Sequence, residues 1–211
     1  MEISGKPRFK PEMTLNRIMA LTDGIFAIAM TLLVLSIDLP EKDLSLSGTP
    51  LHKFLLNQLD QFYIYAMSFF LLAVFWIIGH RQSRYFKRTD NKHLWINIFI
   101  LMFVCLVPYS SSLVSDFGDD WMANLFFNTN MFIIALLYWI NWIYGTKDKR
   151  LVDGNLDYSV ISITNIKSKI FLMVSLLAII LSLFIPFYAG YSYLLLILFF
   201  NLIFQLFFCF L

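Results

Sequence analysis

The chain has 211 residues, of which 59% are hydrophobic, 18% aromatic and only 14% charged, and its mean hydropathy is +0.72. A soluble domain carries about 25% charged residues because it must cover its surface for water, so a soluble globular protein is excluded. The net charge of +2 is uninformative without the positions of the charges. The two cysteines, Cys105 and Cys209, lie in apolar runs without a C-x-x-C spacing, and we expect no redox or metal role for them.

Six apolar stretches are long enough to cross a membrane, since a bilayer core about 30 Å thick needs about twenty helical residues. They cover residues 18–37, 59–79, 94–113, 121–144, 170–188 and 191–211. The stretches are continuously apolar rather than alternating, which indicates helices and not barrel strands. The sequence therefore predicts an all-α membrane protein of six transmembrane helices in a single domain, residues 1–211. The first span is expected to be a retained signal anchor, without a cleavable signal peptide.

The basic residues lie on one side of this six-span arrangement. Fourteen of the sixteen lysines and arginines belong to the N-terminal segment, the connection after the second span and the connection after the fourth span. The opposite connections hold only Lys42 and Lys53, among several aspartates. Because Lys and Arg are enriched in cytoplasmic loops, we expect both termini in the cytoplasm and a multi-pass protein of the cell membrane.

The first span carries an ionisable residue inside its apolar run. Asp23 lies about one turn into the membrane, where a charge is costly and marks a candidate functional site. The structural alternative is that Asp23 binds a side chain of another helix and fixes the packing. Arg17 of the same chain is six residues away and thus on a different face of the helix. Arg17 of a neighbouring chain, His80 and Arg81 are the expected partners.

A stripe of small, aliphatic and hydroxyl side chains follows the same span. Gly24, Ile28, Thr31 and Leu35 recur at intervals of four, three and four residues, which places them on one helix face. Several alanines in the span permit a close approach of neighbouring helices. Taken alone, such a stripe is found more often in helix packing than in a pore.

Several motifs of known transport and enzyme classes are missing from the sequence. There is no T-V-G-Y-G-like filter loop, no Lys or Arg in the fourth span, and no Walker, H-E-x-x-H or G-x-S-x-G motif. An ordinary potassium-channel filter, an Arg-based voltage sensor, ATP-driven transport and membrane hydrolysis therefore lack support. We expect no enzyme activity, no cofactor, no metal site and no nucleic-acid partner.

The first span opens Arg17-Ile-Met-Ala-Leu-Thr-Asp-Gly24 and continues Phe-Ala-Ile-Ala-Met-Thr-Leu-Leu-Val over residues 26–34. It resembles the first helix of the transmembrane protein 175 family of prokaryotic and lysosomal potassium channels, which opens R-x-x-x-F-S-D-G and continues in an A-I-x-x-T-L-L-V-like run. Leu21 and Thr22 replace the Phe and Ser of that motif. Matches at Trp76, His80, Asn97 and Pro108, and the six-span spacing, extend the resemblance over nearly the whole chain.

The resemblance implies a homotetramer in the lipid bilayer, with the first helix of each subunit lining a central pore for K⁺. By motif position, Ile28 forms a hydrophobic constriction, Thr31 a hydroxyl ring beyond it, and Leu32 and Leu35 further apolar rings. An apolar ring discriminates between ions by the cost of removing part of their water shell. A polar network is expected to hold this pore helix, with the members Arg17, Thr22, Asp23, Gly24, His80 and Asn97.

Two other functions remain open from the sequence. A proton-linked secondary transporter would use Asp23 and His80 as titrating groups. A scaffold protein without transport would satisfy the polar face of the first span by packing alone. In the channel interpretation, Asp38 and the other aspartates of the outer connections would concentrate cations at the mouth of the pore.

Overall fold

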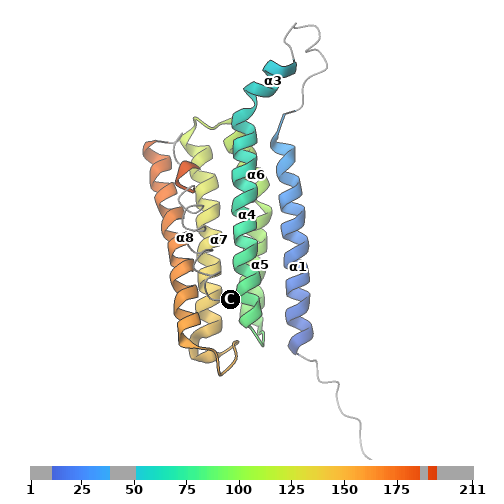
Figure 1. Cartoon of the computed structure of the whole chain (residues 1–211), viewed down its shortest axis with the longest axis vertical. Coiled ribbons are helices and arrows are strands. Elements are labelled where there is room, and N and C mark those ends of the chain that lie inside the picture. The colour runs from blue at the N-terminus through green and yellow to red at the C-terminus, as the bar shows by residue number, and fades with distance from the viewer. Residues whose placement is uncertain (1–10, 39–50, 186–189, 194–211) are drawn as a thin grey trace, which may run out of the picture.

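The structure, a computed structural model, describes residues 11–38, 51–185 and 190–193. Long helices lie side by side and run nearly parallel to the long axis of the molecule (Figure 1). The elements in chain order are α1 (Pro11–Leu32), η1 (Leu33–Ser36), α3 (Leu51–Asn57), α4 (Leu59–Tyr85), α5 (Asn91–Cys105), α6 (Val107–Asp116), α7 (Trp121–Thr146), η2 (Lys147–Lys149), α8 (Tyr158–Phe184) and η3 (Gly190–Tyr193).

Within these described residues, five helical stretches are long and apolar enough to cross a membrane. They are Leu15–Ser36, Leu59–Tyr85, Asn91–Asp116, Trp121–Lys149 and Tyr158–Phe184. Each contains or overlaps one of the first five predicted spans. The sixth predicted span, residues 191–211, lies outside the described residues apart from its first three positions.

The fifth helix is longer than its apolar stretch. α8 begins at Tyr158 rather than near residue 170, because the carboxylate of Asp157 caps it and accepts the backbone N–H of Ser159 at 3.1 Å. The connection between the fourth and fifth spans therefore covers only residues 147–157. A count of apolar residues missed the first three turns of α8 because they are mostly polar.

The third predicted span is a helix with one interruption. α5 ends at Cys105, and α6 continues in the same span after Leu106. Pro108 stands in the first turn of α6, where a missing backbone N–H costs no helical hydrogen bond. The hydroxyl groups of Ser111 on α6 and Ser68 on α4 then lie 2.8 Å apart in the core and join the two helices.

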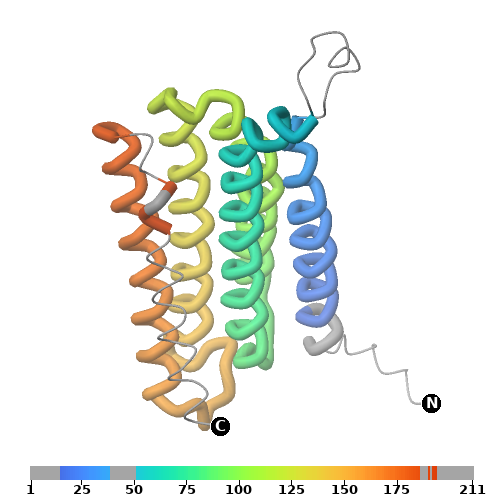
Figure 2. Tube along the Cα trace, turned by 45° about the horizontal axis from the view of Figure 1, so that its top comes forward, coloured from blue at the N-terminus to red at the C-terminus, as the bar shows by residue number. Residues whose placement is uncertain are grey.

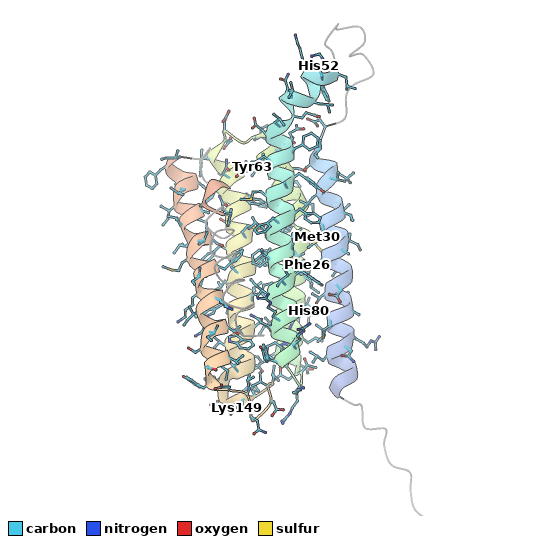
Figure 3. The ribbon with its side chains drawn as sticks, in the orientation of Figure 1. Phe26, Met30, His52, Tyr63, His80 and Lys149 are labelled. Atoms are coloured by element: carbon cyan, nitrogen blue, oxygen red, sulfur yellow. The ribbon has the colours of Figure 1, made fainter. Side chains whose placement is uncertain are left out.

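The larger of two hydrophobic clusters among the described residues holds α1 against the other helices. Phe26, Ala29 and Leu33 of α1 are buried in it, and Phe26 is only 1% exposed. Figure 3 shows Phe26 and Met30 on the side of α1 that faces α4. The same core includes Leu71, Leu72 and Phe75 from α4, and Ile100 and Val104 from α5. One face of α1 is therefore fixed by apolar packing against two neighbouring helices.

The connections alternate between the two ends of the bundle. The start of α1, the α4–α5 connection and the α7–α8 connection lie at one end, and α3, η1 and the α6–α7 connection lie at the other (Figures 1 and 2). The first end, which we call the basic end, carries Arg81, Arg84, Lys87, Arg88, Lys92, Lys147, Lys149 and Arg150. The opposite end, which we call the acidic end, carries Asp38, Asp60, Asp116, Asp119 and Asp120.

Candidate functional site

α1 has one face in the bundle and one face turned away from it. Leu15, Ile18 and Phe26 are buried. Ile28 is 60% exposed and Leu35 is 75% exposed. The predicted stripe thus lies on the outward face of α1, where Gly24, Thr31 and Leu32 are exposed as well.

The outward face of α1 has no side chain at Gly24 and a hydroxyl group at Thr31. A Cβ atom placed on Gly24 meets no heavy atom within 4 Å. The hydroxyl group of Thr31 donates a hydrogen bond to the backbone carbonyl of Ile28 at 2.8 Å. Since a hydroxyl oxygen also has acceptor lone pairs, Thr31 presents an acceptor on the exposed side of the helix.

Asp23 is bound to α4 by a residue that sequence reasoning did not name as its partner. The indole Nε1 of Trp76 donates a hydrogen bond to Oδ1 of Asp23 at 2.8 Å. His80, one of the expected partners, stacks instead on the Trp76 ring, with the ring centroids 5.4 Å apart and an interplanar angle of 23°. The sequence held a signal for Trp76, because Trp76 lies four residues from the expected partner His80 and thus shares a helix face with it.

A small pocket gathers four of the six residues expected in the polar network. Thr22 and Asp23 from α1, His80 from α4 and Asn97 from α5 all line it. The other two expected members lie elsewhere, since Arg17 and Gly24 are exposed on α1 and do not line this pocket.

Thr22 and Asn97 each donate a hydrogen bond to a backbone carbonyl of their own helix. The Thr22 hydroxyl donates to the carbonyl of Ile18 in the same helix at 2.9 Å. Nδ2 of Asn97 donates to the carbonyl of His93 at 2.8 Å and to Oδ1 of Asn141 at 3.4 Å. Nδ2 of Asn141 in turn donates to Oε1 of Gln82 at 3.3 Å. A chain of three side-chain amides thus joins α5, α7 and α4, and two of its members, Asn97 and Asn141, line the pocket.

His93 is a further residue of this pocket, and the sequence gave no hint of it. It lies at the start of α5, is only 2% exposed and lines the pocket beside Asn97. Its Nδ1 lies 2.8 Å from the hydroxyl oxygen of Thr89, whereas its Nε2 has no hydrogen-bond partner among the described residues. A buried polar atom without a partner is rare in proteins, so His93 is the least satisfied polar group of the site.

A cluster of polar residues at the basic end holds α5 and α7 together below the pocket. Asp90 caps α5 and accepts the His93 N–H at 2.9 Å and the Tyr144 hydroxyl at 2.6 Å. The guanidinium of Arg150 donates to the Tyr144 hydroxyl at 3.0 Å and lies 5.0 Å from the ring centroid. Burial acts to raise the pKa of Asp90, but the hydrogen bonds from Tyr144 and His93 outweigh it and hold that pKa below its ordinary value of 3.8.

The acidic end of the first span is held by the side chains of Gln61 in α4 and of Gln58, the residue that precedes α4. Nε2 of Gln61 donates to Oδ2 of Asp38 at 2.7 Å, and its Oε1 accepts the Asp38 N–H at 3.2 Å. Nε2 of Gln58 donates to the Asp38 carbonyl at 2.6 Å. The first span is therefore tied to α4 near both of its ends, at Asp23 and at Asp38.

Part of this chain matches a known protein family. A family model described as "Endosomal/lysosomal potassium channel TMEM175" matches residues 17–108, which contain α4, α5 and the greater part of α1. Residues 17–108 of the chain are thus similar to the TMEM175 family. The proteins that it matches are named as channels, and the five long apolar helices among its described residues are those of a membrane-embedded protein.

Two bacterial relatives of the family and one solved structure illustrate the similarity. A potassium channel of Streptomyces collinus is 28% identical over 156 residues, which are 72% of this chain and 74% of the relative. A potassium channel of Chamaesiphon minutus is 35% identical over 102 residues, 48% of this chain and 50% of the relative. The crystal structure of a lysosomal potassium-selective channel TMEM175 homolog from Chamaesiphon minutus has a TM-score of 0.79 at 24% identity, covering 90% of this chain and 97% of that one. The chain therefore has the fold of that TMEM175 homolog.

Proposed function

We propose that this protein is a potassium-preferring cation channel of the cell membrane, with a pore lined by the outward face of α1 from four copies of the chain. The observation that carries the proposal is that face itself. Gly24, Ile28, Thr31 and Leu35 form one exposed stripe on a helix whose opposite face is buried in the core. A ring of identical subunits brings one such stripe from each copy to a common axis.

The order of side chains along the stripe suits a constriction followed by a wider polar ring. Ile28 is the large aliphatic residue that follows Gly24, and we assign the narrowest part of the pore to it. The hydroxyl group of Thr31 lies about one turn beyond it, and Leu32 and Leu35 form further apolar rings. An apolar ring conducts when it is wide enough to stay hydrated and closes by dewetting when it narrows.

Selectivity in such a pore depends on the water shell of the ion. No cage of carbonyl groups replaces the water that an ion loses at an aliphatic ring, so the ion that is dehydrated at the smaller cost passes more readily. K⁺ is dehydrated at a smaller cost than Na⁺, and we therefore propose a preference for K⁺ that is weaker than in a carbonyl-lined filter.

We infer the orientation of the channel in the membrane from the charges at the two ends of the bundle. The basic end would lie in the cytoplasm, together with both termini, by the positive-inside rule. The acidic end would then lie outside, where Asp38 and the aspartates of the α6–α7 connection would raise the local concentration of cations.

Flux measurements with the purified chain in liposomes test this function. A K⁺ gradient should drive flux that Na⁺ supports less well, and Ile28→Asn should raise the flux and weaken the discrimination between the two ions. Met173→Asn is the matched control, since Met173 is 66% exposed in α8 and lies away from α1. Absence of K⁺ flux from a folded, reconstituted protein would reject the channel. Unchanged flux and selectivity in Ile28→Asn would reject this residue as the constriction.

A proton-linked transporter is the second candidate, because Asp23 and His80 line one pocket and both contact Trp76. In that case the flux of the transported ion would saturate and would depend on a pH gradient. Asp23→Asn and His80→Gln would abolish the pH dependence. A linear current that is indifferent to the pH gradient favours the channel.

A further inference from the structure

A second, larger pocket lies between α4 and α8 at the basic end of the bundle. It has a volume of about 230 Å³ and is lined by residues of these two helices. Three of its lining side chains are cationic, namely Arg81 and Arg84 from α4 and Lys167 from α8. The described residues that line it include no carboxylate. The pocket shares no lining residue with the Asp23 pocket.

The cations of this pocket come from helix positions near the membrane surface. Arg81 and Arg84 belong to the last two turns of α4, beyond its apolar stretch. Lys167 precedes the apolar stretch of α8, which starts near residue 170. Near the same level, the ammonium group of Lys169 lies 6.0 Å from the ring centroid of Trp139. Tryptophan rings are enriched where the hydrocarbon meets the polar headgroups, so the pocket opens at headgroup depth.

The pocket also has an apolar side. Ile78 of α4, and Val160 and Ile163 of α8, contribute aliphatic walls next to the cations. Ile163 is 49% exposed on the outside of the bundle. Thr164 and Ser168 add hydroxyl groups to the α8 wall. This combination of cations, hydroxyl groups and aliphatic side chains matches a molecule with a phosphate group and a hydrocarbon part.

The cations of this pocket suit a phosphate group by the chemistry of their donors. Guanidinium groups bind phosphate through paired hydrogen bonds, and an ammonium group binds it as a point charge. A phosphate bound by cations of both helices would therefore connect α4 with α8.

We propose that this pocket binds the phosphate headgroup of an anionic phospholipid, with the start of its acyl chains against Ile78 and Ile163. Basic pockets between transmembrane helices recognise such headgroups in general. The volume of about 230 Å³ is below that of typical pockets for drug-sized ligands, and it suits a headgroup rather than a whole lipid. The site is independent of the α1 pore, so it stands whether or not the chain conducts K⁺.

Native mass spectrometry of the full-length protein, titrated with phosphatidylglycerol or with phosphatidylcholine, tests the proposal. The wild type should bind phosphatidylglycerol more tightly than phosphatidylcholine. The triple variant Arg81→Gln, Arg84→Gln and Lys167→Gln should lose about tenfold or more in affinity for phosphatidylglycerol and should bind phosphatidylcholine as the wild type does.

A matched triple variant separates the pocket from general surface charge. Lys87→Gln, Arg88→Gln and Lys92→Gln removes the same charge from exposed positions at the same end, and its affinity for phosphatidylglycerol should change by less than about twofold. Equal losses in both triple variants would overturn the proposal, as would equal binding of the two lipids by the wild type. Inorganic phosphate binding the pocket as tightly as phosphatidylglycerol would overturn the lipid as ligand and leave a soluble anion.

Single variants of Lys167 cover the case in which the triple variant does not fold. Lys167→Gln should weaken the binding of phosphatidylglycerol, and Lys167→Arg, which keeps the charge, should restore it. Failure of Lys167→Arg to restore binding, with both variants folded by size-exclusion chromatography, would reject the charge of Lys167 as the recognition element.

Discussion

Trp76 and Asp23 join the second transmembrane helix to the first through one hydrogen bond of 2.8 Å, from the indole Nε1 to the carboxylate Oδ1. Asp23 precedes the exposed stripe of α1, and His80 stacks on the other side of the same indole ring. The residue that the sequence marked as a candidate functional acid is thus part of the attachment between two helices. This hydrogen bond adds to the apolar packing that orients α1 about its own axis.

Removal of the indole donor should loosen α1. Trp76→Phe keeps an aromatic ring for His80 but leaves Asp23 without its donor, and we expect a loss of about 1 kcal/mol in the free energy of unfolding together with altered K⁺ flux. Trp95→Phe is the control, because Trp95 is 58% exposed on α5 and its ring lies tilted against that of Phe99. Thermal unfolding in detergent and liposome flux measure the two effects. Equal behaviour of the two variants would contradict the attachment.

Two glycines should respond in opposite ways to alanine. A Cβ at Gly24 meets nothing within 4 Å in the subunit, so Gly24→Ala should leave subunit stability unchanged or raise it by up to about 1 kcal/mol. A Cβ at Gly79 would lie 2.7 Å from the hydroxyl oxygen of Tyr138, so Gly79→Ala should lower the melting temperature.

The K⁺ flux of the Gly24→Ala variant tests whether Gly24 lies near the axis of a pore. If four copies of α1 meet near Gly24, Gly24→Ala should reduce K⁺ flux although the subunit is stable. Normal flux in Gly24→Ala would place Gly24 away from the axis.

The hydroxyl group of Thr31 should matter for conduction more than for stability. Its hydrogen bond to the Ile28 carbonyl lies within one helix and is exposed, so Thr31→Val should change the free energy of unfolding by less than about 0.5 kcal/mol. The same substitution should lower K⁺ flux, because a methyl group replaces the acceptor of the hydroxyl ring. Thr31→Ser keeps the hydroxyl and should conduct like the wild type. Single-channel recordings of the three proteins decide the matter, and equal conductance of Thr31→Val and wild type would refute a hydroxyl ring.

The cluster at the basic end should make stability dependent on acid pH. The pKa of Asp90 lies below 3.8 in the folded protein, so the folded state favours the ionised carboxylate. Its contribution to stability is complete above the ordinary pKa of an aspartate and is lost as the pH falls through the lowered pKa. We therefore expect the melting temperature to fall as the pH is lowered from 5 toward 3.

Tyr144→Phe checks the origin of this acid sensitivity. The variant removes the hydroxyl that donates to Asp90 at 2.6 Å, so its melting temperature should be lower near neutral pH and should decrease less between pH 5 and pH 3. Asp90→Asn should remove the part of the pH dependence that Asp90 supplies. An undiminished pH dependence in Asp90→Asn would assign it to other carboxylates.

The membrane character of this protein, its first five spans and the stripe on the first span follow from the sequence by itself. Apolar length and helical periodicity are local properties, and they depend only on the order of residues such as Gly24, Ile28, Thr31 and Leu35. The separation of basic and aspartate-rich connections is also local, since it depends on which loops follow which spans. The start of α8 at Tyr158 was missed because a helix can extend beyond its apolar stretch when a cap such as Asp157 begins it.

Only the tertiary structure decided which residues meet. The pairing of Asp23 with Trp76 depends on the rotation of α1 and α4 about their axes, and this rotation follows from the packing of Phe26, Ala29 and Leu33 in the shared core. The burial of His93 beside Asn97 and the gathering of Arg81, Arg84 and Lys167 in one pocket depend likewise on helices distant in sequence. The physical reason is that the spacing along one helix defines its faces, whereas the partner of each face is chosen by the close packing of the whole bundle.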